Sequence, residues 1–183
     1  MSKMEWGPAM PSEQPNTGKD ERHAIAVLVD NEPGVLARVV GLFSGRGYNI
    51  DSLTVTEVSH EENQSRITIV THGSPAIIEQ IKSQLGRLVP VHAVTDLTIK
   101  GDPVERELAL IKVAGKGEKR VESLRLAEAF RAQIVDATTE HFVFEITGRT
   151  SKLETFINLM KPLGLVEVAR TGAAAIARGP EAM

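Results

Sequence analysis

The chain has 183 residues, 42% of them hydrophobic and 25% charged, which is enough for one medium-sized globular domain or two small ones. Its formal net charge of −3 argues against a nucleic-acid partner and against an anionic membrane partner. Because the chain contains no cysteine, disulfides, thiolate catalysis and zinc–thiolate sites are excluded.

The N-terminal stretch, residues 1–21, is predicted to be a disordered lead. It contains three prolines and many polar residues, and it lacks the apolar core of a secretory signal. No apolar run anywhere in the chain approaches the roughly 20 residues that a membrane helix needs. We therefore expect no membrane partner and a cytoplasmic location.

The first half of the chain begins with a predicted strand and helix. Residues 23–30 form a β-branched apolar run, typical of a strand buried on at least one face. After a break at Asn31–Gly34, residues 35–44 predict a helix. The Gly45–Gly47 stretch ends it, because glycine adopts the left-handed conformation at little cost. The apolar stripe of this helix is predicted at Leu36, Val39, Val40 and Phe43.

Two strands, a helix and a fourth strand follow. Residues 50–58 and 66–71 alternate between apolar and polar side chains and predict a hairpin. Ser74-Pro75 supplies an N-cap and a first helical residue, Pro90 ends the helix, and residues 91–99 predict the last strand. The order β-α-β-β-α-β is that of a ferredoxin-like unit. The apolar stripe of the second helix is Ile77, Ile78, Ile81, Leu85 and Leu88.

The second half of the chain repeats this order. Its strands are predicted at residues 105–113, 133–138, 141–147 and 165–170, and its helices at 119–130 and 150–161. Gly101–Pro103 interrupts both patterns and is the predicted linker. The predicted fold class is therefore α+β, with two tandem ferredoxin-like domains at residues 22–101 and 104–171. A Gly/Ala-rich tail follows at residues 172–183.

The loop Asn31–Gly34 is the most informative candidate site. It exposes the first amides of a helix, those of Gly34, Val35 and Leu36, and such amides bind anions with the help of the helix dipole. A free amino acid's carboxylate is a suitable anion, and the Asn31 amide could orient its ammonium. A plain β–α turn has the same composition, however, and turn chemistry alone favours that interpretation.

Other site chemistries find little support. The Gly45–Ile50 stretch and the later Ala114–Glu118 loop lack the spacing of nucleotide-binding loops. The five histidines are scattered without metal-ligand spacing, and no serine nucleophile motif occurs. We therefore predict no catalytic residues and no metal site in this chain.

Several segments resemble the small regulatory subunits of acetohydroxyacid synthase (acetolactate synthase). The most specific is Asn31–Val55, and the similarity extends over residues 22–179. The further matching segments are Val104–Val113, Phe130–Asp136, Glu145–Gly148, Lys152-Leu153, Glu167–Gly172 and Ala177–Gly179.

The resemblance implies an N-terminal ACT domain at residues 22–101, a homodimer formed through ACT domains, and a role without catalysis. Such subunits activate a large catalytic subunit and confer feedback inhibition by valine, often also by leucine or isoleucine. No cofactor is expected in this subunit, whereas thiamine diphosphate, Mg²⁺ and FAD are expected in the catalytic subunit.

The resemblance also implies an effector (valine) site at the interface between two ACT domains. One chain would contribute Asn31, Gly34, Val35 and Leu36, and the other Asn49 and Ile50. An apolar wall from Leu36 and Ile50 would favour valine over alanine by about 1.6 kcal/mol, or roughly 15-fold.

The alternative function is a free-standing ACT-domain amino-acid sensor or transcriptional regulator. A transcriptional regulator would need a DNA-binding helix pair, and no segment offers one with clustered Lys and Arg.

Overall fold

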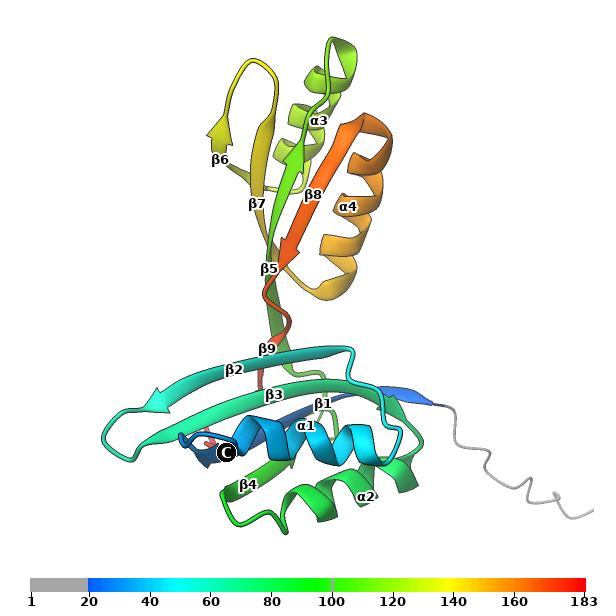
Figure 1. Cartoon of the computed structure of the whole chain (residues 1–183). Coiled ribbons are helices and arrows are strands. Elements are labelled where there is room, and N and C mark those ends of the chain that lie inside the picture. Colours follow the sequence, from blue (N-terminus) through cyan, green and yellow to red (C-terminus); the bar gives the residue numbers. More distant parts are fainter. Residues whose placement is uncertain (1–19, 100) are drawn as a thin grey trace, which may run out of the picture.

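The computed structural model describes residues 20–99 and 101–183. The lead predicted for residues 1–21 lies almost entirely outside the described residues, although its last residue, Glu21, begins the first strand. The chain forms two domains of the same kind (Figure 1), which confirms the predicted α+β fold class with tandem ferredoxin-like units.

The first domain contains four antiparallel strands and two helices that cover one face of the sheet (Figure 1). The strand order is β2-β3-β1-β4, so the first and third strands in sequence lie at the centre, as the ferredoxin-like unit requires. In chain order the elements are β1 (Glu21–Asp30), α1 (Val35–Gly45), β2 (Ser52–Ser59), β3 (Gln64–Gly73), α2 (Pro75–Leu85) and β4 (Val91–Asp96).

The core of the first domain is almost wholly aliphatic, with Phe43 as its one fully buried ring. Helix α2 buries Ile78, Ile81 and Leu85, as its predicted stripe requires. The other fully or nearly fully buried members are Ile25, Val27, Val29, Val35, Val39, Ile67 and Ile69.

The predicted stripe of α1 is wrong at its first residue. The helix buries Val35, Val39 and Phe43, which recur every four residues along one face, and Leu36 remains 41% exposed. Val35, Val39 and Phe43 face the sheet, and Leu36 lies about 100° around the helix from Val35. Leu36 is therefore available at the surface.

The second domain repeats the topology with the strand order β6-β7-β5-β8. Helix α4 buries Leu153, Phe156 and Met160 and runs three residues beyond its predicted end, through Pro162. A proline in the last turn removes few helical hydrogen bonds, so the helix tolerates it. The elements are β5 (Val104–Val113), α3 (Glu118–Ala129), β6 (Gln133–Ala137), β7 (Phe142–Gly148), α4 (Thr150–Gly164) and β8 (Leu165–Arg170).

The C-terminal segment returns to the first domain. Strand β9 (Ala174–Ile176) pairs antiparallel with the beginning of β5, and Ala175 is buried together with Ala24, Ala26 and Leu97. Ala24 and Ala26 alternate along β1 with residues that face the helices, so they lie on the opposite face of the sheet. Strand β1 is thus covered on both faces, which explains its nearly continuous apolar sequence.

Candidate effector site and the cleft between the domains

The beginning of α1 presents free backbone donors. Gly34 precedes the helix with φ 88°, and no side chain caps the helix. The Val35 amide has only a long bond of 3.4 Å to the Glu32 carbonyl, and within residues 20–99 and 101–183 the amides of Gly34 and Leu36 have no acceptor. Because these N–H groups coincide with the positive end of the helix dipole, an anion can bind here.

The side chains around these amides differ in their exposure. Those of Asn31 and Leu36 are exposed, whereas Val35 is turned into the core and offers a ligand only its amide. The Asn31 backbone N–H donates to the Asn63 carbonyl at 2.7 Å, which ties the loop to the β2–β3 turn. We call Asn31, Gly34, Val35 and Leu36 the first half-site.

The second half-site, Asn49 and Ile50, lies at the other end of α1. Asn49 is exposed, and Ile50 packs against the edge of the first core. The Asn49 carbonyl accepts a hydrogen bond of 2.6 Å from the Thr71 hydroxyl. The Asp51 N–H donates to the Val70 carbonyl at 2.8 Å, so β3 holds this segment on both sides of Ile50.

One chain does not bring the two half-sites together. Helix α1 separates them, and its 11 residues span about 16 Å. A single amino-acid ligand cannot bridge that length. Contact with both half-sites therefore requires two chains.

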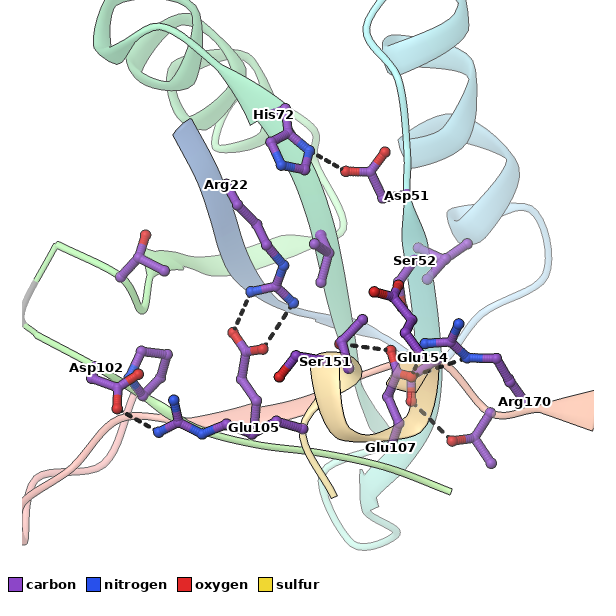
Figure 2. Close-up of a pocket in the computed structure, with 18 of the residues that line it drawn as sticks. Arg22, Asp51, Ser52, His72, Asp102, Glu105, Glu107, Ser151, Glu154 and Arg170 are labelled. Carbon is purple, nitrogen blue, oxygen red and sulfur yellow. Dashed lines mark hydrogen bonds and ion pairs between the residues drawn. The ribbon is translucent and has the colours of Figure 1, made fainter. Parts of the chain in front are cut away.

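A polar cleft between the two domains is the structural feature that sequence reasoning missed. It encloses about 1000 Å³ and is lined from both domains and from the linker (Figure 2). Its titratable side chains come from the beginnings of β1 and β5, the residue before β2, the end of β3, the linker, the beginning of α4 and the end of β8. No sequence spacing links these positions, because only the packing of one domain on the other brings them together.

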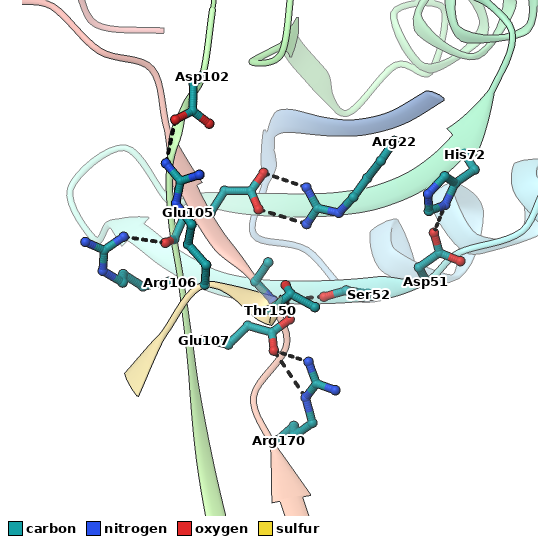
Figure 3. A network of polar contacts seen from close by, with 12 residues as sticks. Arg22, Asp51, Ser52, His72, Asp102, Glu105, Arg106, Glu107, Thr150 and Arg170 are labelled. Atoms are coloured by element: carbon teal, nitrogen blue, oxygen red, sulfur yellow. Dashed lines mark hydrogen bonds and ion pairs between the residues drawn. The ribbon is translucent and has the colours of Figure 1, made fainter. Parts of the chain in front are cut away.

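Ion pairs connect the elements around this cleft (Figures 2 and 3). Arg22 donates two hydrogen bonds to Glu105 across the domain boundary, at 2.9 and 2.8 Å. These bonds raise the pKa of the Arg22 guanidinium above its ordinary value. Nearby, Glu107 accepts from Arg170 and from the Thr150 hydroxyl. Of these contacts, the Arg22–Glu105 pair joins the two domains, whereas those of Glu107 lie within the second domain.

The linker is held in a similar way. Arg149, directly before α4, donates to Asp102, and this hydrogen bond lowers the pKa of the Asp102 carboxyl. Within the part of the chain that the structure describes, no group of three or more His, Asp or Glu side chains is placed to hold a metal ion. The helices of the same part include none that is long and apolar enough to cross a membrane.

Family models match both domains. Residues 25–93 match the AHAS small subunit-like ACT domain, so the first domain belongs to the ACT class of regulatory domains. Residues 106–179 match the model of the small subunit of acetolactate synthase. The chain belongs to the acetolactate synthase small-subunit family.

Individual relatives agree with this assignment. The probable acetolactate synthase small subunit of Archaeoglobus fulgidus is 48% identical over 86% of this chain and 98% of its own length. The acetolactate synthase isozyme 3 small subunit of Escherichia coli is 42% identical over 88% of this chain and 99% of its own. The crystal structure of the small subunit from Thermotoga maritima superimposes with a TM-score of 0.78 at 43% identity, covering 88% of this chain and 99% of that one.

Proposed function

We propose that this chain activates the thiamine-diphosphate-dependent catalytic subunit of acetolactate synthase and makes it subject to feedback inhibition by valine in branched-chain amino acid biosynthesis. Leucine and isoleucine are the further candidate effectors. Thiamine diphosphate, Mg²⁺ and FAD belong in this proposal to the catalytic subunit, and none to this chain. The membership of the small-subunit family supports the partnership with that subunit.

The observation that carries the effector part of the proposal is the separation of the half-sites by α1. Free amides at one end of the helix suit a carboxylate, and an asparagine beside an apolar residue at the other end suits the remainder of an amino acid. If a ligand must contact both, it joins two chains, and its binding free energy is then coupled to the geometry of the dimer.

We place the homodimer interface at β2. This strand lies at the edge of the first sheet, pairs only with β3 within the described residues, and leaves a row of backbone groups free. Val55 and Val58 on this strand are 42% and 50% exposed, and Leu36 is also exposed. Pairing with a second ACT domain would cover these backbone groups and apolar side chains together.

Valine fits the proposed pocket by charge and by size. Its carboxylate would face the amides of Gly34 and Leu36 of one chain, and Ile50 of the other chain would supply an apolar wall. The exposed Leu36 side chain extends that wall, whereas Val35 contributes only its amide. Burial of the two extra carbon groups of valine relative to alanine is the source of the expected preference of roughly 15-fold.

Reconstitution with the catalytic subunit tests the proposal. The isolated chain should form no acetolactate, and its addition should raise the turnover of the catalytic subunit and make that turnover sensitive to valine. If mixing changes neither the rate nor the inhibition, the proposal is wrong. Valine binding by a chain that leaves the catalytic subunit unaffected would favour the alternative, a free-standing ACT-domain sensor or transcriptional regulator.

A further inference from the structure

We propose that Asp51 is a positioning residue of the effector site: its carboxylate orients the Asn49 side chain so that the amide oxygen faces the ammonium of the bound amino acid. This inference rests on the proposed function. It assigns to each half-site one end of the ligand.

The Asn49 side chain has its own defined partner. Its Nδ2 donates a hydrogen bond of 2.6 Å to Asp51 Oδ1. An ionised carboxylate only accepts hydrogen bonds, so the amide must present its nitrogen to Asp51. The amide oxygen is then directed away from Asp51, which makes Asn49 an acceptor at the site.

The second oxygen of Asp51 is held by the neighbouring strand. Oδ2 pairs with His72 Nδ1 at 2.5 Å (Figure 3), and His72 belongs to β3. The backbone of residues 49–51 is tied to the same strand through Thr71 and Val70. The carboxylate therefore cannot turn away from Asn49 without breaking a second contact.

The orientation of the Asn49 amide determines the direction in which the ligand lies between the two half-sites. An acceptor oxygen attracts an ammonium, whereas the free amides of α1 attract a carboxylate. A bound amino acid would therefore extend its ammonium toward Asn49 of one chain and its carboxylate toward Gly34 and Leu36 of the other. A ligand with a carboxylate but no ammonium fits only half of this arrangement.

The preference of Asn49 for an ammonium group has a regulatory consequence. Acetolactate, the product that names the family, carries a carboxylate and a hydroxyl but no ammonium. An Asn49 held as an acceptor distinguishes an amino acid from such hydroxy acids. The enzyme's own product would then be a poor ligand of the site that inhibits it.

The test uses the intact chain with Asp51→Asn and two ligands of the same shape, valine and 2-hydroxyisovalerate, whose hydroxyl replaces the ammonium. Dissociation constants are measured by calorimetry. The asparagine at residue 51 can donate to the Asn49 oxygen, so the Asn49 amide can reverse and direct its nitrogen at the ligand ammonium. We expect valine affinity to fall about tenfold or more, with a smaller loss for 2-hydroxyisovalerate. The dissociation constant of 2-hydroxyisovalerate divided by that of valine should therefore fall.

Two variants serve as controls. Asp51→Glu keeps the carboxylate and should recover part of the discrimination. Asp136→Asn removes a carboxylate of the same kind, paired with His141 at 2.8 Å in the second domain, and should change neither constant.

Each outcome decides a separate claim. An unchanged ratio in Asp51→Asn, or an equal loss for both ligands, overturns the positioning role. Failure of the unmodified chain to bind valine contradicts the proposed effector function itself.

Discussion

At the scale of single residues, Gly34 has both a backbone conformation that favours glycine and a place beside the free amides of α1. Its φ of 88° lies in the left-handed region, where a side chain adds strain of about 1–2 kcal/mol. A Cβ built there would meet no atom within 4 Å, so the space beside the helix amides is open. The backbone needs glycine here independently of any ligand, and a test of the ligand role must separate charge from strain.

Gly34→Asp and Gly34→Asn form a matched pair for that test. Both side chains have the same shape and tolerate the left-handed conformation, and they differ in charge. We expect the Asp variant to bind valine at least about tenfold more weakly than the Asn variant, because its carboxylate occupies the place of the effector carboxylate. Calorimetry measures the affinities, and both variants should still activate the catalytic subunit. Equal affinities would show that no carboxylate binds at this helix end.

The residues of the candidate site were predictable to different degrees. The composition of Asn31–Gly34 alone predicts a turn followed by the beginning of a helix. The resemblance to the small-subunit family supplied the prediction that Asn49 and Ile50 belong to the same effector site. The exposure of Leu36 was not predicted: Val35 and Leu36 are both apolar, Val39 and Phe43 fit a stripe that starts at either residue, and packing on the sheet selects Val35. The hydrogen bond from Asn49 to Asp51 is supported by the contact between Asp51 and His72. No local sequence pattern predicts that His72 lies beside Asp51.

At the scale of secondary-structure elements, β2 is one of the two edge strands of the first sheet, the other being β4. On its side away from β3 this eight-residue strand leaves backbone groups free for another strand, and Glu57 is its one charged residue that could disfavour pairing. Apolar side-chain patterns predicted this strand and the other eleven long elements, and most of them have a face in a core; β6 was predicted as well, although all five of its residues are exposed. Strand β9 escaped prediction, since three residues of a Gly/Ala-rich stretch show no periodicity and its partner lies about 70 residues earlier in the chain.

Val55→Lys should weaken the proposed homodimer. A lysine on each of two facing edges adds like charges and removes apolar contact, so we expect the dimer dissociation constant to rise tenfold or more. Sedimentation velocity over a concentration series measures it, and valine affinity should fall in parallel because the site needs two chains. Val121→Lys, at a position of α3 that is 49% exposed, is the matched control. If Val55→Lys sediments like the control, the interface lies elsewhere.

At the scale of the whole molecule, the C-terminal segment holds the two domains together. The Ser52 hydroxyl accepts from the Ala173 N–H at 2.9 Å, and Arg66 donates to the Ala175 carbonyl at 2.8 Å. Burial lowers the pKa of Arg66. Small side chains allow this segment to lie directly on the first sheet, so its Gly/Ala composition is a packing requirement.

Gly172→Ala should loosen this contact. Gly172 has φ 83°, and a Cβ there would lie 2.8 Å from Ser52 Oγ and 2.9 Å from Thr54 Oγ1. We expect a loss of stability of about 2–4 kcal/mol, combining backbone strain with the clash, and faster amide exchange in β9 and the beginning of β5. Thermal unfolding and hydrogen exchange measure both effects.

Gly179→Ala is the control for that substitution. Its φ of 105° imposes comparable strain, but no atom lies within 4 Å of its Cβ. Equal destabilisation by the two variants would mean that the contact between Gly172 and β2 contributes nothing beyond strain.

The return of the C-terminal segment means that the chain passes between the domains twice, outward at Gly101–Pro103 and back at Thr171–Ala173. A body attached at one point can turn about three axes, whereas a body attached at two separate points turns freely about only the line that joins them. We therefore expect the second domain to move as a hinge with a single axis. Any change in the pairing of ACT domains would then reach the second domain as a rotation of defined direction.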